Sequence, residues 1–296
     1  MNHRTRLSIL IVCAMACFAA APQLFAQSDQ SQQQSQQQQS QQQTNPPQQT
    51  QKPSLANPQQ NTPAPPPVDP KEEAAYKAFY DMKPATPADL DAQIQAGEAF
   101  VKDFPKSRYL ESVYARLTLV YFQKRDLDKM YDAADKALAL NPDNVDVLTH
   151  VGWVIPRNSS VPNFAQLLAK AEQYEKHALE ILSTLTKPAG LTDEQFNKSK
   201  AFETSEAHSG LGLVYFREQK YDESSAELTK ATDGSSETDP TDYFILGVDL
   251  ENLQKFPDSV KAFDSCAQIQ SPLQDQCKQQ SADAKAKEAA APPHKP

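Results

Sequence analysis

The sequence has few glycines and no run of alternating apolar and polar residues. Seven glycines occur among its 296 residues. Strands that are buried on one face alternate in polarity, and the turns that join them favour glycine. The scarcity of both signals in residues 71–287 excludes a β-sheet domain, whereas apolar residues spaced three and four apart recur through this stretch. The sequence therefore predicts an all-α fold.

Motifs for catalysis and for metal binding are missing as well. The chain has no HExxH zinc motif, no GxSxG nucleophile turn, no phosphate-binding glycine loop and no CxxC pair. His150, His177 and His208 fall on separate predicted helices, without the spacing of metal ligands. We expect no enzymatic activity, no cofactor and no metal. Only a site assembled across several helices would escape these patterns.

Positive charge is also in short supply. The chain has 29 Lys and Arg against 38 Asp and Glu, a formal net charge of −9, and its basic residues do not gather into a stripe. Nucleic acids and anionic membrane surfaces bind through clustered positive charge, so neither is expected as the main partner.

Residues 1–26 have the pattern of a secretory leader. A short basic segment precedes an apolar run over residues 7–20, and Ala26 is a small residue suited to cleavage. A membrane anchor is one alternative, although the run is shorter than the ~20 residues of a spanning helix. A lipoprotein acylated at Cys13 or Cys17 is another. The leader predicts an exported, periplasmic bacterial protein without a membrane span in its mature form, where loss of two arginines makes the net charge −11.

Residues 27–70 are dominated by glutamine and proline. Glutamine supplies 17 of the 34 residues in 27–60, and prolines follow. Such a segment lacks the apolar mass that would offset the entropy of ordering it, which predicts a disordered tether. A sequence expansion without a role is the alternative. Residues 290–296, rich in proline, are also predicted to be disordered.

The two cysteines outside the leader, Cys266 and Cys277, lie 11 residues apart. In an oxidising compartment outside the cytoplasm such a pair favours a disulfide. Two small buried thiols are the alternative.

One phrase occurs twice in the chain. Residues 117–128 read LTLVYFQKRDLD, and residues 211–222 read LGLVYFREQKYD. Self-similarity of this kind is typical of proteins built from repeated helix pairs. Small residues at the helix crossings, bulky residues between them and the ending ALALNPDN make residues 111–144 resemble a tetratricopeptide repeat. The phrase AFVKDFPKSRY, at residues 99–109, resembles the repeats of bacterial envelope members of that family.

The resemblance implies an α-solenoid of about five antiparallel helix pairs plus a C-terminal capping helix, over residues 71–289. The predicted units are 71–109, 111–144, an expanded 145–204, 205–239 and 240–273, followed by the capping helix 273–289. The two copies of the phrase are 94 residues apart, which equals one 34-residue repeat and one of 60. We expect the 26 extra residues in an enlarged turn and a connector.

Two helix starts carry capping residues. Thr86 precedes Pro87 and Asp89, and Thr192 precedes Gln195 by three positions. The helix that follows Thr192 is predicted to run unbroken to about residue 219.

In tetratricopeptide proteins the first helix of each pair lines a concave surface. Carried over position by position, the resemblance implies a partner-binding groove formed by Leu119, Phe122, Gln123, Trp153, Arg157, Leu213, Phe216, Arg217 and Phe244. This apolar and aromatic composition suits an extended peptide or an amphipathic helix. The alternative is a groove filled by the chain itself. The Lys and Asn residues with which chaperone-binding members hold a C-terminal carboxylate are absent from the corresponding positions.

Together these features predict a non-enzymatic scaffold of the cell envelope that binds a protein partner. The alternative is a binding protein for a small apolar or glycan ligand in a closed channel. An open groove along several repeats would favour the first function, and a closed pocket with converging polar groups the second.

Overall fold

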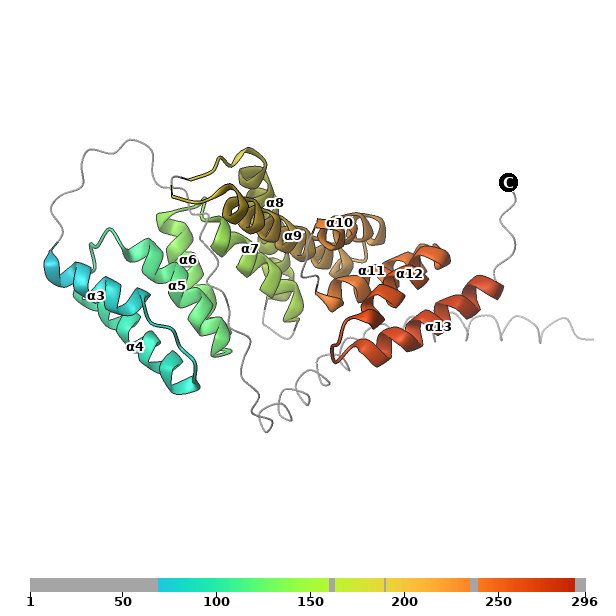
Figure 1. Cartoon of the computed structure of the whole chain (residues 1–296), viewed down its shortest axis with the longest axis horizontal. Helices are drawn as coiled ribbons and strands as arrows, with labels where there is room; N and C mark the ends of the chain where they lie inside the picture. The colour runs from blue at the N-terminus through green and yellow to red at the C-terminus, as the bar shows by residue number, and fades with distance from the viewer. Residues whose placement is uncertain (1–68, 160–162, 189, 235–238, 291–296) are drawn as a thin grey trace, which may run out of the picture. The chain divides into compact units, whose positions relative to one another are not determined.

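The computed structural model describes residues 69–159, 163–188, 190–234 and 239–290, and all regular elements within these ranges are helical (Figure 1). The all-α prediction is confirmed. The predicted leader and almost all of the predicted tether and tail lie outside the described residues. Residues 69–254 belong to one compact unit and residues 255–290 to another.

Helix pairs build the first unit. They are α3 (Pro70–Tyr80) with α4 (Pro87–Asp103), α5 (Leu110–Gln123) with α6 (Leu127–Leu140), α7 (Val145–Val154) with α8 (Phe164–Thr184), and α9 (Asp193–Arg217) with α10 (Tyr221–Gly234), after which α11 (Pro240–Asn252) follows. A 3-10 turn, η1 (Ile155–Arg157), extends α7. First helices of successive pairs also pack together, α5 with α7, α7 with α9, and α9 with α11. The unit is a tetratricopeptide-like solenoid, as the resemblance implied.

The duplicated phrase folds into the same turn twice. Arg125 after α5 and Gln219 after α9 both have left-handed backbones, with φ of 59° and 60°. The amide of Asp126 donates to the carbonyl of Tyr121 at 3.0 Å, and that of Lys220 to the carbonyl of Tyr215 at 2.9 Å. These bonds close the ends of the two helices and offset the ~1 kcal/mol that a left-handed non-glycine residue costs.

The predicted helix starts are confirmed. Thr86 and Asp89 form a reciprocal capping box at α4, and Thr192 and Gln195 form one at α9. The α9 helix then runs without a break for 25 residues. Each box satisfies amide groups that the first helical turn leaves without partners.

The extra residues of the expanded unit mostly lengthen helices. The α8 helix has 21 residues and α9 has 25, whereas α5 and α6 have 14 each. The prediction that placed the insertion in a turn and a connector was therefore wrong for much of it. The added helical turns bury Leu182 of α8 beside Val145 of α7, with Phe196 of α9 packed against them. Both helices are longer because the apolar residues of their added turns are covered by neighbouring helices.

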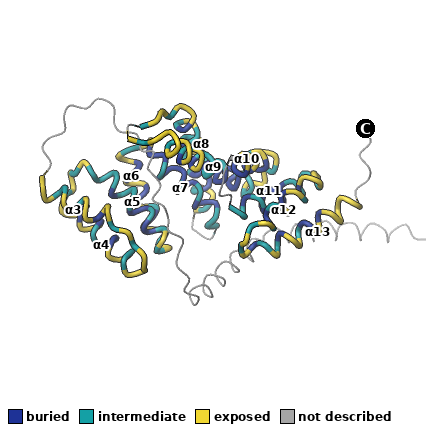
Figure 2. Tube along the Cα trace, viewed as in Figure 1, coloured by how far each residue is buried: buried dark blue, intermediate teal, exposed yellow. Residues whose placement is uncertain are grey.

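Besides the small cluster around Leu182, two larger apolar clusters lie in the described part of the first unit, and the buried positions follow the inner sides of its helices (Figure 2). The first cluster includes Phe79, Phe100 and Met130 and joins α3 to α6. The second joins α6 to α9 and is rich in alanine, with Ala134 and Ala171 fully buried. Small side chains let these helices approach closely.

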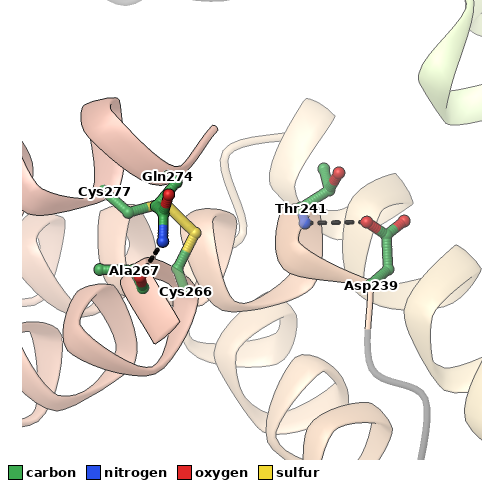
Figure 3. The surroundings of a disulfide bond; sticks show 6 residues. All are labelled: Asp239, Thr241, Cys266, Ala267, Gln274 and Cys277. Atoms are coloured by element: carbon green, nitrogen blue, oxygen red, sulfur yellow. Dashed lines mark hydrogen bonds between the residues drawn. A yellow bond between two sulfur atoms is a disulfide. The ribbon is translucent and has the colours of Figure 1, made fainter. Parts of the chain in front are cut away.

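In the described part of the second unit, α12 (Phe256–Gln268) and α13 (Gln274–Ala290) pack side by side. A disulfide joins Cys266 of α12 to Cys277 of α13, with their Cα atoms 5.8 Å apart (Figure 3).

Candidate functional site

Three aromatic side chains meet where α5 crosses α7. The ring of Phe122 on α5 lies edge-on to His150 at 4.7 Å and to Trp153 at 6.4 Å between ring centroids. His150 and Trp153 are three residues apart, so they occupy the same face of α7. All three are only partly buried, and Gln123 beside them is exposed. We call Phe122, His150 and Trp153 the aromatic strip.

Arg157 ends the strip and is engaged within the chain. Its guanidinium carbon lies 3.8 Å from the centroid of the Trp153 ring, and Nη1 donates to the Trp153 carbonyl at 3.0 Å. Nη2 donates to Ser209 Oγ at 3.0 Å and pairs with Asp239 at 3.1 Å and Asp242 at 3.3 Å. The side chain is 16% exposed. Arg157 therefore ties η1 to α9 and to the start of α11.

Asp242, one of the two acidic partners of Arg157, titrates near neutrality. Burial raises the pKa of Asp242 to about 7, although Arg157 lowers it; the charge of Asp239 adds to the increase. Ser209 donates its hydroxyl hydrogen to Asp242 at 2.7 Å while it accepts from Arg157. These groups satisfy one another, which makes the cluster a structural junction.

Two of the predicted groove residues are buried in the structure. Leu213 is 1% exposed and Phe244 is 8% exposed, so neither offers surface to a partner, and the prediction was wrong for them. Leu213 is buried because its helix, α9, is surrounded by α7, α8, η1, α10 and α11.

The other predicted groove residues keep some surface. Leu119, Phe216 and Arg217 are partly buried. Arg217 Nε donates to the carbonyl of Pro156 at 2.8 Å, and the Phe216 ring lies 6.3 Å from that of Tyr221. Arg217 thus holds η1 in place from α9. The structure brings Phe122, Trp153 and Arg157 together as one group.

Sequence reasoning missed a carboxyl group at the centre of the unit. Glu175 of α8 is completely buried, and neither of its oxygens has a hydrogen-bond partner among the described residues. A Cβ at Gly210 would lie 1.9 Å from Glu175 Oε1, and one at Gly152 would lie 2.5 Å from it. Gly210 thus allows α8 and α9 to pack closely at this point. Burial raises the pKa of Glu175 well above its usual value, and the negative charge of Glu206 adds a smaller increase. The positive charge of Arg157 opposes both effects.

A sequence signal for Glu175 did exist. It lies four residues after Ala171 and three before Ala178, on the helix face that the apolar pattern assigns to the core. The polar partners of Arg157, by contrast, come from distant parts of the chain and leave no local pattern.

Metal ligation and membrane insertion find no support within the described residues. No three His, Cys, Asp or Glu side chains converge there as they would around a metal ion. His177 and His208 each meet a single carboxylate, at 2.8 and 2.6 Å. Within the same ranges, no helix combines the length and the apolar character needed to cross a bilayer.

The fold and the strip define a tetratricopeptide-like solenoid protein. Its sequence matches no protein-family model and no curated protein. Among solved structures it is similar to PilW, a type IV pilus biogenesis factor, at 14% identity over 77% of this chain and 96% of that one, with a TM-score of 0.49. PilF of Pseudomonas aeruginosa is 14% identical over 76% of this chain and 93% of its own, with a TM-score of 0.48. The tetratricopeptide protein TTC0263 of Thermus thermophilus is 13% identical over 73% of this chain and 99% of its own, with a TM-score of 0.43. At such identities the likeness concerns the fold alone.

Proposed function

We propose that the protein is a non-enzymatic scaffold of the cell envelope and that it binds a peptide or helix of a partner protein along α5 and α7. The observation that carries the proposal is the aromatic strip, which crosses two consecutive first helices and stays partly exposed. The leader-like residues 1–26 support the envelope as its location.

The composition of the strip supports a protein partner. Aromatic side chains supply large contact area at small entropic cost, and a few such anchors often dominate the energy of an interface. Arg157 is already paired with Asp239 and Asp242, so it positions Trp153 and does not act as a free cation for a ligand. Binding would therefore rest on the rings of Phe122 and Trp153 and on the exposed amide of Gln123.

The proposal is tested by photo-crosslinking in the intact envelope. A photoreactive phenylalanine analogue replaces Gln123 in the full chain, and a matched variant carries it at Ala139, an exposed position on α6 of the same helix pair. We expect a defined partner to be captured from position 123 and not from position 139. Capture from position 123 should fall at least about tenfold with Trp153→Ala, because that change removes an anchor worth ~2 kcal/mol.

Folding controls accompany this experiment. Trp153→Phe keeps an aromatic ring and should retain most of the capture, and circular dichroism checks that each variant keeps its helix content. Equal capture from positions 123 and 139, or capture that is indifferent to Trp153→Ala in a folded protein, would show that the strip is not the contact surface.

A further inference from the structure

The last helix of the described chain has almost nothing apolar with which to pack. The 17 residues of α13 read QDQCKQQSADAKAKEAA and include no valine, isoleucine, leucine, methionine or aromatic residue. Its buried residues are Cys277, Ser281 and Ala284. These lie four and three positions apart, so they form a single narrow face of the helix. By comparison, α6 buries five residues, among them Met130 and Leu138.

The polar contacts of Gln274, Ser281 and Lys285 add little to the hold on α13. Ser281 donates to Asp264 of α12 at 2.5 Å, and Lys285 pairs with the same carboxylate at 3.2 Å. Both members of that ion pair are about half exposed, and exposed pairs of this kind contribute little to stability. Gln274, at the start of the helix, donates to the carbonyl of Ala267 at 3.0 Å (Figure 3).

The disulfide links the two helices covalently. Cys266 and Cys277 are both fully buried between α12 and α13 and are separated by 11 residues. Closing a loop of that length favours the closed form by roughly 100-fold through chain entropy. Burial of one methyl group contributes only about fourfold. A free helix of this length is itself only marginally stable in water.

We propose that the disulfide is a redox latch, which keeps α13 folded against α12 when it is formed and releases the helix when the two cysteines are thiols. Formation of the bond removes two electrons and two protons from the thiols, and a disulfide oxidant takes them up as it becomes a dithiol. Reduction runs in the opposite direction at the expense of a thiol reductant. Because both sulfur atoms are buried, reduction must wait for a local opening of α13.

The latch links the C-terminal unit to the redox state of its surroundings. A newly made chain in a reducing compartment would leave α13 undocked and would expose the face of α12 that carries Cys266. Oxidation would then fold the helix down and cover that face. This inference does not depend on the proposed partner surface, which lies in residues 69–254.

Hydrogen exchange followed by mass spectrometry tests the latch. The full mature chain is compared in three forms: oxidised, reduced by unfolding and refolding in a thiol reductant, and as the double variant Cys266→Ser with Cys277→Ser. All samples are reduced at acid quench, so that peptides from α13 are recovered equally. We expect amides of residues 278–290 to exchange at least about tenfold faster in the reduced form and in the variant than in the oxidised form. Amides of α5 and α6 should not change.

A re-latching control isolates the role of the covalent link. The reduced protein is treated with a short reagent that bridges two thiols, and protection of α13 should return. The Ser281→Ala variant in its oxidised form should keep its protection, because it loses only one hydrogen bond. Equal protection of α13 in the oxidised and reduced forms would overturn the proposal, since the noncovalent contacts would then suffice. Loss of protection in α5 and α6 together with α13 would also overturn it, because the bond would then support the whole fold.

Discussion

Asp249 gives the sharpest test of the buried charges in this protein. It lies on α11 with no exposed surface, and its Oδ2 is 2.5 Å from Ser224 Oγ of α10. The Ser224 hydroxyl also lies 2.8 Å from the carbonyl of Gly212, and one hydroxyl hydrogen cannot serve both acceptors. Both contacts are satisfied when Asp249 carries a proton and donates to Ser224, which in turn donates to Gly212. Burial accordingly raises the pKa of Asp249 to about 8, against the lowering effect of Ser224.

The sign and size of the effect on stability follow from this pKa. Between the ordinary value of 3.8 and about 8, the folded chain holds a proton at Asp249 that the unfolded chain has released. Stability therefore falls as pH rises through this window. At pH 7 the difference spans about three pH units, which corresponds to roughly 4 kcal/mol. The Asp249→Asn variant keeps the shape and places an N–H donor toward Ser224, so it should escape this cost.

Urea unfolding at pH 4 and pH 7, followed by circular dichroism, measures the effect. Relative to the wild type, Asp249→Asn should be more stable at pH 7 than at pH 4 by up to about 4 kcal/mol. Asp103→Asn, a change at an exposed position on α4, serves as the matched control and should show no such trend. The same stability difference between variant and wild type at both pH values would refute the assignment of a proton to Asp249.

Two further predictions concern the centre of the first unit. Arg157→Gln should reduce the free energy of unfolding by about 3 kcal/mol at pH 8, because it leaves the buried Asp242 without its cation. The loss should be smaller at pH 5, where the carboxyl group of Asp242 is protonated. Urea unfolding at the two pH values measures both losses, and an equal loss at each pH would contradict the reasoning. Gly210→Ala should cost about 2 kcal/mol or more, because its Cβ would meet Oε1 of Glu175. Adding Glu175→Ala to that variant should restore part of its melting temperature, and a further drop would show that the clash is not the cause.

Much of the fold could be predicted because its determinants are local. The capping residues Thr86 and Thr192 act within three positions of themselves, and both helix starts were found. The LVYF phrase specifies a helix, a left-handed residue and a second helix within a dozen residues, and it gave the same turn at Arg125 and Gln219. The place of the extra residues in the expanded unit was harder to assign, because the added helical turns depend on the covering of Val145 by Leu182.

The candidate site was only partly predictable. Position within a repeat indicated that Phe122 and Trp153 share a surface, and their rings do lie edge-on to each other. The same rule failed for Leu213 and Phe244, because a repeat pattern states which helix face a residue occupies and not which neighbouring helices cover that face.

The sequence by itself determined the helices, their pairing and the spacing of the cysteines, since each depends on residues close together in the chain. Only the tertiary structure decided the surroundings of the buried charged groups, and with them the ionisation of the buried carboxyl groups. The pairing of Arg157 with Asp242, the contact of Ser224 with Asp249 and the burial of Glu175 join different helices. Because the ionisation of a carboxyl group depends on its burial and on the groups that face it, these properties exist only once the helices have packed.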